Sequence, residues 1–265
     1  MTNIISNYNS LLTKLSTEFL YPRVVDLPLV QSSYYVPFII FAYLYLVLEC
    51  GPRFMKNRQP YSLTTFIRLY NLIQIVANTW LIYYFIDAGL FTNSYLICRE
   101  LDYSFNYTPL RLTRGIWYYF LLKILDYVET GIFVLRKKNN QITGLHLYHH
   151  VSTLTLTWLG LRYYAISAIS LSCTINSFIH MLMYTYYFLA TYGPNVQKAI
   201  ASFKQWITRA QMAQFVILIV YVSQNFLPAC HVVSHWIVLL YIGNLIINFC
   251  LFYNFYQKTY NKLKI

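Results

Sequence analysis

The chain contains continuous apolar stretches that are long enough to cross a lipid bilayer as helices. About 20 apolar residues span the hydrocarbon core of a bilayer as an α-helix. The stretches lack the strict apolar–polar alternation of a membrane β-barrel, so helices are the expected secondary structure. They lie at approximately 34–50, 66–86, 115–135, 145–161, 165–190, 206–227 and 232–256. The sequence therefore predicts an all-α fold, a polytopic membrane bundle of seven transmembrane helices.

Composition excludes the main soluble classes. Hydrophobic residues make up 58% of the chain and charged residues only 11%, against roughly 25% charged residues in an ordinary soluble domain. A disordered chain needs low hydrophobicity and high charge. The net charge of +12 would suit a nucleic-acid-binding protein, but such a protein would not be this apolar. A lipid bilayer is the expected partner, and nucleic acid is not.

Basic residues are distributed unequally between the two sides of the predicted bundle. One set of loops holds 11 Lys and Arg residues and the other set holds 6. The richer set comprises 51–65, 136–144, 191–205 and the tail 257–265. Because cytosolic loops are enriched in Lys and Arg, we predict a luminal N-terminus and a cytosolic C-terminus. The chain then divides into a luminal segment 1–33, a membrane domain 34–256 and a basic cytosolic tail 257–265.

Two features agree with this orientation. Asn106 begins Asn-Tyr-Thr, the only N-glycosylation acceptor sequence in the chain, and lies in a loop assigned to the lumen. Cys98 and Cys230 lie in two loops on that same oxidising side, so we predict a disulfide between them. Two free cysteines are the alternative.

Histidines gather at the start of the fourth predicted span. His146, His149 and His150 lie within about 100° of arc on one helix face. A single histidine in a helix is usually a hydrogen-bonded structural residue, but three on one face at a membrane boundary indicate a functional site. His231 and His235 lie at the luminal end and are interpreted as interfacial or structural.

Three other predicted spans carry polar residues at helical spacing. They are Asn176, His180, Tyr184 and Tyr187 on the fifth span, Lys123, Asp126, Glu129 and Thr130 on the third, and Thr208, Gln211 and Gln214 on the sixth. Each set has a structural alternative, as interhelical hydrogen bonds or as an ion pair of Lys123 with Asp126. Because four helices each present a polar face, we expect a shared interior cavity.

Three kinds of function compete for such a site. A histidine-rich di-iron oxygenase needs more histidines than the six present, although three of them would suffice for a single zinc ion. A seven-helix receptor or transporter leaves the histidine cluster unexplained. The third is acyl transfer on a lipid, since neutral imidazole is a nucleophile and a base near neutral pH, and the chain has no Gly-x-Ser-x-Gly motif.

The order and spacing of these residues resemble the ELO family, the very-long-chain fatty acid elongases of the endoplasmic reticulum. The match covers about 51–256 and includes Gly51-Pro52 and Tyr70-Asn71. Its central motifs are Lys123-x-x-Asp126-x-x-Glu129-Thr130, His146-x-x-His149-His150, His180-x-x-Met183-Tyr184-x-Tyr186-Tyr187 and Thr208-x-x-Gln211-x-x-Gln214. The family's first motif usually reads Lys-x-x-Glu-x-x-Asp-Thr, so the two acidic residues are exchanged here.

The resemblance implies condensation of a long-chain acyl-CoA with malonyl-CoA, in the endoplasmic reticulum membrane, to give 3-oxoacyl-CoA, CoA and CO2. It implies no metal and no cofactor besides the two substrates. Other enzymes of the elongation cycle and a second copy of the chain are further candidate partners. Residues expected to bind CoA are Arg136, Lys137, Lys138, Tyr187 and Lys204. For the basic residues among them, the ordinary positive-inside bias is the alternative.

The expected mechanism is ping-pong. His149 attacks the acyl thioester and holds an acyl-imidazole, and malonyl-CoA then decarboxylates and takes the acyl group. Further expected roles are stabilisation of the enolate by His180 with Asn176 or Gln211, proton exchange by His146 and His150, and positioning by Asp126 and Lys123. Spacing alone does not separate His149 from His150 as the acylated residue. The alternatives are a histidine-ligated, metal-dependent lipid enzyme and a non-enzymatic lipid-binding protein.

Overall fold

The computed structural model describes residues 22–91, 104–164, 169–227, 230 and 233–261. Within these ranges the chain is helical and contains no β-strand, which confirms the all-α prediction. The main helices are α2 (Tyr35–Tyr45), α3 (Gly51–Met55), α4 (Thr64–Asp87), α5 (Tyr107–Leu125), α6 (Tyr127–Leu135), α7 (Gly144–Leu159), α8 (Ile169–Ala190), α9 (Pro194–Ser223) and α10 (His235–Tyr256). The π-helical segment Leu46–Cys50 joins α2 to α3, and the π-helical segments Gly160–Tyr164 and Gln257–Asn261 extend α7 and α10.

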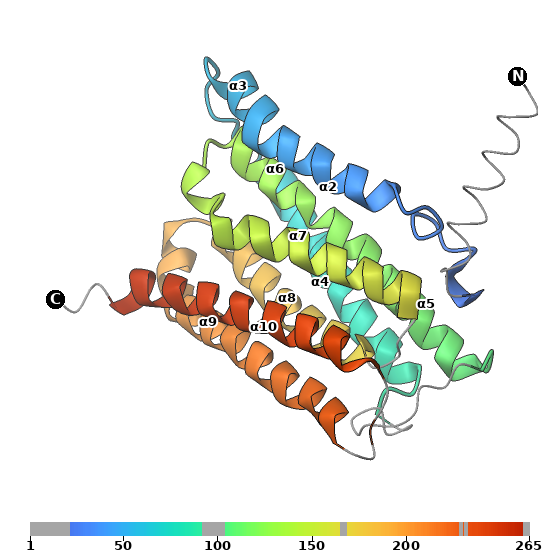
Figure 1. Ribbon diagram of the computed structural model, residues 1–265. Coiled ribbons are helices and arrows are strands. Elements are labelled where there is room, and N and C mark those ends of the chain that lie inside the picture. Colours follow the sequence, from blue (N-terminus) through green and yellow to red (C-terminus); the bar gives the residue numbers. More distant parts are fainter. Residues whose placement is uncertain (1–21, 92–103, 165–168, 228–229, 231–232, 262–265) are drawn as a thin grey trace, which may run out of the picture.

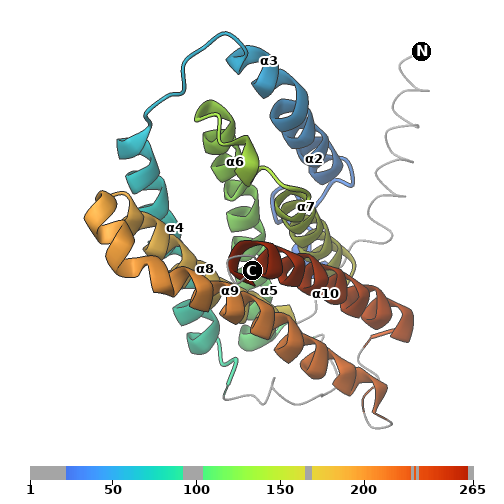
Figure 2. The same cartoon turned by 90° about the vertical axis from the view of Figure 1, so that its left-hand side faces the viewer.

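These helices lie side by side in one bundle (Figures 1 and 2). α4 packs along α8, α8 along α9, and α9 along α10, while α7 contacts α10. α5 contacts α4, α7 and α8, so it stands at the centre of the bundle. Side chains on the faces of α4, α7 and α8 that pack on α5 are therefore close to it.

Large apolar side chains cover the outer surface. Phe38, Phe41, Val76, Val220 and Leu240 are each at least 60% exposed, which is unfavourable in water and favourable in lipid. Four helical stretches are long and apolar enough to cross a membrane, namely Tyr35–Met55, Thr64–Asp87, Pro194–Phe226 and His235–Asn261. The fold is therefore that of a multi-pass membrane protein.

The remaining predicted spans are helical but more polar. They correspond to α5 with α6, to α7 and to α8. Their polar residues include Lys123, Asp126 and Asn176, together with His146, His149 and His150 on α7 and His180 on α8. Such residues lower the mean hydropathy of a helix. The count of seven spans and the side on which each terminus lies stay predictions.

Two helices begin earlier than the apolar windows predict. α5 begins at Tyr107 rather than near 115, and α9 begins at Pro194 rather than near 206. A hydropathy window detects only the apolar part of a helix, whereas 107–114 and 194–205 are more polar but still helical. Pro194 is suited to the first turn, because the N–H that proline lacks is unpaired there in any case. Lys204 consequently lies on a helix and not in the predicted loop.

The close packing of α5 on α4 depends on Gly115. A Cβ atom at this position would lie 2.6 Å from Cε1 of Phe85, closer than two carbon atoms approach in proteins. Phe85 is fully buried, so it has little room to move away. The missing side chain lets the two helices approach, and the polar face of α4 then reaches Asp126 at the end of α5 through Gln74.

Candidate active site

A buried ion pair lies at the centre of the bundle. Lys123 is in the last turn of α5, and Asp126 lies in the short break between α5 and α6. Nζ of Lys123 is 2.8 Å from Oδ2 of Asp126, and each side chain is only 2% exposed. A buried ion pair is tolerated when its geometry is good and its remaining donors and acceptors are satisfied.

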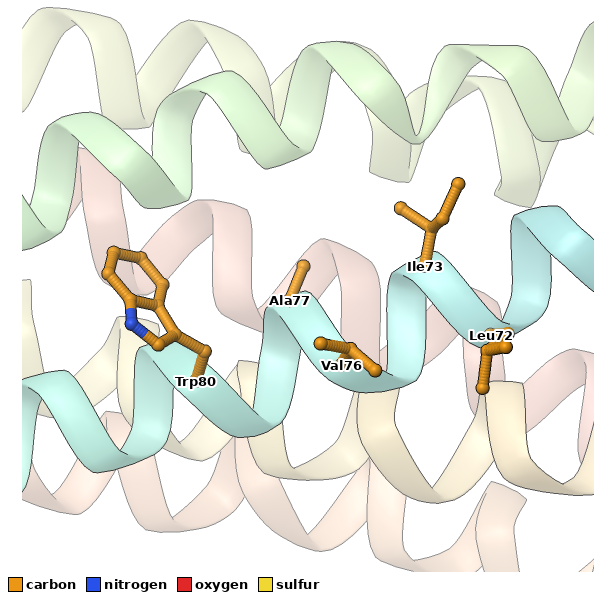
Figure 3. Close-up of a pocket in the computed structure, with 5 residues that line it drawn as sticks. All are labelled: Leu72, Ile73, Val76, Ala77 and Trp80. Atoms are coloured by element: carbon orange, nitrogen blue, oxygen red, sulfur yellow. The ribbon is translucent and has the colours of Figure 1, made fainter.

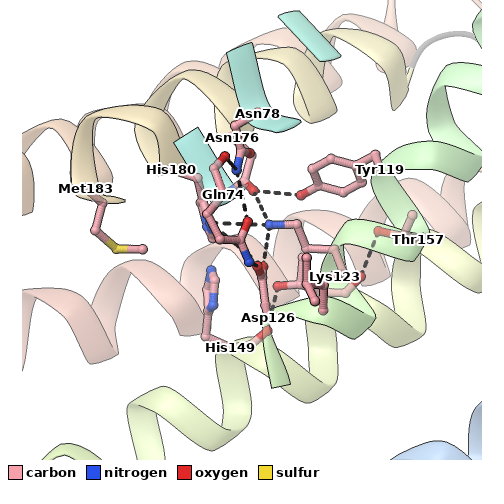
Figure 4. A network of polar contacts seen from close by, with 12 residues as sticks. Gln74, Asn78, Tyr119, Lys123, Asp126, His149, Thr157, Asn176, His180 and Met183 are labelled. Atoms are coloured by element: carbon pink, nitrogen blue, oxygen red, sulfur yellow. Dashed lines mark hydrogen bonds and ion pairs between the residues drawn. The ribbon is translucent and has the colours of Figure 1, made fainter. Parts of the chain in front are cut away.

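Lys123 uses its other donors on α8. Its Nζ lies 3.1 Å from Oδ1 of Asn176 and 3.5 Å from Nδ1 of His180 (Figure 4). An ammonium group has three donors and no acceptor, so Nδ1 of His180 must accept. The proton of the neutral imidazole then sits on Nε2. Tyr119 completes the group by donating to Oδ1 of Asn176 at 2.7 Å.

His149 on α7 faces His180. The centroids of the two imidazole rings lie 6.3 Å apart, and the ring planes are inclined by 20° (Figure 4). The hydrogen bonds of His149 involve its backbone carbonyl, which accepts from Ser152 and Thr153, and its ring nitrogens are unpaired within the described part of the chain. A nucleophilic imidazole needs such a free lone pair.

The other two histidines of α7 belong to a second polar group. Nε2 of His146 lies 2.8 Å from Oγ1 of Thr130 on α6, and the same hydroxyl lies 2.9 Å from the hydroxyl of Tyr43 on α2. His150 is buried, with its ring centroid 4.2 Å from that of His146 and 5.7 Å from that of His149. This group connects α2 with the histidine that faces His180.

Glu129, His146 and His150 together offer a donor set for a metal ion. Each contributes one candidate ligand atom, and these atoms lie within 4.8 Å of one another. Two imidazole nitrogens and a carboxylate oxygen are ligands that zinc accepts. Because Thr130 already bonds to Nε2 of His146, a metal ion here would displace Thr130 or take Nδ1 instead.

α4 supplies residues that the sequence analysis did not assign to the site. Gln74 is fully buried, and its Nε2 donates to Oδ1 of Asp126 at 2.8 Å and to the Tyr70 hydroxyl at 2.9 Å. Asn78 donates to the backbone carbonyl of Gln74 at 2.8 Å. Polar residues at 70, 74 and 78 form a stripe with the same spacing as 176, 180 and 184. This spacing is the signal that would have revealed them.

Comparison with known proteins identifies the family. A profile of the ELO family, described as the GNS1/SUR4 family, matches residues 28–264. This chain belongs to the ELO family. Very long chain fatty acid elongase 4 of Mus musculus is 36% identical over 250 residues, which cover 91% of this chain and 77% of the mouse protein. The Homo sapiens elongase 4 is also 36% identical, over 91% of this chain and 76% of its own length. Very long chain fatty acid elongase 1 of Mus musculus is 34% identical over 244 residues, 92% of this chain and 87% of its own length.

The motif of this ELO protein on α9, Thr208-x-x-Gln211-x-x-Gln214, makes no hydrogen bond with the network around Lys123 and Asp126 in the part of the chain that the structure describes. Nε2 of Gln211 lies 3.6 Å from Sδ of Met183 on α8. Oγ1 of Thr208 lies 3.1 Å from the Lys204 carbonyl and 3.4 Å from the Tyr260 hydroxyl. Gln214 is buried, and its Oε1 has no hydrogen-bond partner in the part of the chain that the structure describes. The observed contacts of α9 therefore join it to α8 and to the end of α10 rather than to Lys123.

The two tyrosines predicted on α8 differ in environment. Tyr184 is fully buried, and its hydroxyl lies 3.3 Å from Oδ1 of Asp126 and 3.4 Å from the Tyr70 hydroxyl. Tyr187 is 37% exposed, and its ring packs edge-on against that of Tyr184. Tyr184 thus belongs to the network around Asp126, and Tyr187 lies at its edge.

The basic residues expected to bind CoA lie at the end of the bundle where α7 begins. Arg136, Lys137 and Lys138 directly follow α6, and Lys204 is exposed on the first half of α9, on the left in Figure 1. Nζ of Lys137 donates to the Lys56 carbonyl at 3.4 Å. The histidine motif of α7 starts at this same end.

The described residues among those predicted to be luminal lie at the opposite end of the bundle, where α5 begins (Figure 1). Asn106 is exposed and directly precedes α5. Cys230 is disulfide-bonded, but Cys98 lies outside the described residues, so the pairing of the two stays a prediction. His231 also lies outside the described residues, and His235 begins α10, where its ring packs on Phe226.

An apolar groove lies on the outer face of α4. It has a volume of about 420 Å³ and is lined by Leu72, Ile73, Val76, Ala77 and Trp80 (Figure 3). At about 100° per residue, Leu72, Val76 and Trp80 lie more than 100° from the centre of the polar stripe at 70, 74 and 78, and Ala77 lies at the border of that stripe. The groove therefore faces away from the polar network, and the expected interior cavity for an acyl chain stays a prediction.

Proposed function

We propose that this ELO protein is an acyltransferase that condenses a long-chain acyl-CoA with malonyl-CoA to give 3-oxoacyl-CoA, CoA and CO2. The similar proteins are named very long chain fatty acid elongases. The observation that carries the proposal is the pair His149 and His180, whose imidazole rings face each other at 6.3 Å inside the bundle. The proposed reaction needs no cofactor besides its two substrates.

In the first half-reaction, His149 accepts the acyl group. An unpaired ring nitrogen of His149 attacks the thioester carbonyl, so that a C–N bond forms and the C–S bond breaks. The departing CoA thiolate takes up the proton that the other ring nitrogen releases. The product is a neutral acyl-imidazole, which passes its acyl group readily to a carbon nucleophile.

In the second half-reaction, malonyl-CoA supplies that nucleophile. Its C–C bond to the carboxylate breaks, CO2 leaves, and the electron pair stays behind as the enolate of acetyl-CoA. His180 would stabilise the enolate oxygen through Nε2–H, because its Nδ1 accepts a hydrogen bond from Lys123 at 3.5 Å. The enolate carbon then attacks the acyl carbonyl, the C–N bond breaks, and His149 leaves as imidazole after taking up a proton from solvent.

The proposal includes the seven predicted spans in the endoplasmic reticulum membrane, with a luminal N-terminus and a cytosolic C-terminus. Its support is that α6, which Arg136 directly follows, ends at one end of the bundle, and α5, which Asn106 directly precedes, begins at the other (Figure 1). Both substrates carry the phosphates of CoA, which guanidinium and ammonium groups bind well. They would enter from the basic end, where other enzymes of the elongation cycle are candidate partners.

Intact-mass spectrometry after incubation with acyl-CoA alone tests the covalent scheme. Wild-type protein should gain the mass of one acyl group, and His149→Ala should gain none. His150→Ala serves as the comparison and should still be acylated, because the ring that stacks with His180 is that of His149, whereas the His150 ring packs on those of His146 and His149. Turnover by a wild-type protein that never carries an acyl adduct would contradict the scheme.

The group formed by Glu129, His146 and His150 makes a metal-dependent lipid enzyme the second candidate. Treatment with a strong chelator, followed by metal analysis, separates the two. Full activity of metal-free protein excludes the second candidate, whereas loss of activity that Zn2+ restores supports it. Decarboxylation of malonyl-CoA that depends on His149 would exclude a protein that only binds lipid.

A further inference from the structure

Gln74 is the residue through which α4 contacts the buried ion pair. Its Nε2 lies 2.8 Å from Oδ1 of Asp126, and its Oε1 lies 3.3 Å from Nδ2 of Asn78. An ionised carboxylate can only accept hydrogen bonds, so the NH2 group of Gln74 must face Asp126. Gln74 is 0% exposed, so bulk solvent does not reach this contact.

The two carboxylate oxygens of Asp126 have separate partners. Oδ2 accepts from Lys123 at 2.8 Å, and Oδ1 accepts from Gln74 at 2.8 Å and from Tyr184 at 3.3 Å. Loss of the Gln74 amide would leave Oδ1 with only the longer of its two bonds. The carboxylate would then be free to turn about its Cβ–Cγ bond, and Lys123 would follow it.

His180 is sensitive to such a shift. Its Nδ1 lies 3.5 Å from Nζ of Lys123, which is near the limit for a hydrogen bond, and 3.8 Å from Oδ2 of Asp126. A small displacement of Lys123 would break the bond that makes Nδ1 the acceptor. The imidazole would then be free to carry its proton on Nδ1, and Nε2 would no longer be a donor.

The lengths of Gln74 and Asp126 are matched. A glutamate at position 126 would place its carboxylate one methylene further from the backbone, toward the fully buried Gln74 on the neighbouring helix. The shorter aspartate leaves the room that the long glutamine side chain fills. The two residues together bridge the space between α4 and the break after α5.

We propose that Gln74 is a positioning residue that acts through Asp126 and Lys123 to hold the proton of His180 on Nε2. The inference deepens the proposed condensation and rests on it wherever activity is the readout. The tautomer of His180 is a readout that does not depend on the reaction.

The first experiment compares steady-state kinetics of Gln74→Met with wild type. Methionine keeps the length of glutamine without its hydrogen bonds, so kcat should fall by about 10- to 100-fold, while KM for both CoA thioesters should change little. The matched control is Asn248→Leu, which also removes a buried amide, one that donates to the Asn244 carbonyl of its own helix at 2.9 Å. The control should keep its kcat. A wild-type kcat in Gln74→Met would overturn the inference.

The second experiment tests the match in length. Asp126→Glu alone should lose activity, because the longer acid collides with Gln74. Adding Gln74→Ala should restore part of the rate, so that the double variant is faster than either single variant. A double variant slower than both single variants would contradict the match.

The third experiment observes the tautomer by NMR of protein labelled with 15N-histidine, with the His180 signals assigned from their loss in His180→Gln. Wild type should show a protonated Nε2 and an unprotonated Nδ1, and Gln74→Met should show both tautomers. A proton on Nδ1 in wild type, or unchanged signals in Gln74→Met, would overturn the inference. An inactive wild-type protein with the expected tautomer would overturn only the proposed function.

Discussion

Nζ of Lys123 on α5 lies 3.5 Å from Nδ1 of His180 on α8, and this contact determines which nitrogen of the imidazole carries the proton. The ammonium group can only donate hydrogen bonds, so Nδ1 beside it must accept, and the proton of the neutral imidazole lies on Nε2. A buried charge pair thus controls the chemistry of a neutral side chain on another helix. The half-buried His149 ring stacks with the His180 ring at a centroid distance of 6.3 Å.

Replacement of His180 by glutamine should separate the two half-reactions. Loss of a preorganised donor for the enolate oxygen should lower kcat by about 10²- to 10³-fold. Acylation of His149 should persist, because that step does not use the enolate. Chemical quench with intact-mass analysis measures both quantities in one sample. Loss of the acyl adduct together with turnover would show that His180 also acts in acyl loading.

Lys123→Met should destabilise the protein strongly. It leaves the carboxylate of Asp126 buried without its counter-ion, which costs about 3–5 kcal/mol. The double variant Lys123→Met with Asp126→Leu removes the unpaired charge, so it should unfold at a higher temperature than the single variant while staying inactive. Thermal unfolding in detergent measures both. Equal stability of the single and double variants would show that the unpaired charge is not the cause.

The hydroxyl of Thr130 should matter more than that of Tyr43. Thr130→Val leaves Nε2 of the half-buried His146 and the hydroxyl of the buried Tyr43 without this partner, which costs about 1–3 kcal/mol. Tyr43→Phe keeps the ring stacked on Tyr127 at 3.8 Å and removes only one hydrogen bond, about 0.5–1.5 kcal/mol. Unfolding free energies of the two variants test this order, with Thr130→Ser as the control that keeps the hydroxyl. The reverse order would mean that Tyr43, not Thr130, holds the group together.

Periodicity predicts a polar face of a helix but not the neighbour that the face meets. Asn176, His180 and Tyr184 stand out because polar residues four positions apart are unusual in an apolar helix, and all three contact Lys123 or Asp126. The same logic places Gln211 on a polar face, yet its described side-chain contact is with Met183. Which helices lie side by side is decided by packing, and no local pattern contains that information.

The residue type of some site residues does not indicate a functional role. Gln74 is an amide in an apolar segment, where interhelical hydrogen bonding is the ordinary explanation, and its importance comes only from the position of Asp126. Tyr43 is one of 28 tyrosines, and its contact with Thr130 joins residues 87 positions apart. Hydropathy windows do not predict the helix starts at Tyr107 and Pro194, because such a window does not distinguish a polar helical turn from a loop.

Glycosylation mapping should test the orientation of the bundle. In cells, Asn106 is expected to carry a glycan, so wild-type protein should migrate faster after endoglycosidase treatment and Asn106→Gln should not respond. The matched control adds Ile142→Thr to Asn106→Gln, which creates the acceptor Asn140-Gln141-Thr at the basic end of the bundle, where Asn140 is exposed. This second acceptor should stay unmodified, because glycans are added only in the lumen and this end is predicted to be cytosolic. A glycan on Asn140 would reverse the proposed orientation and the side from which CoA thioesters enter.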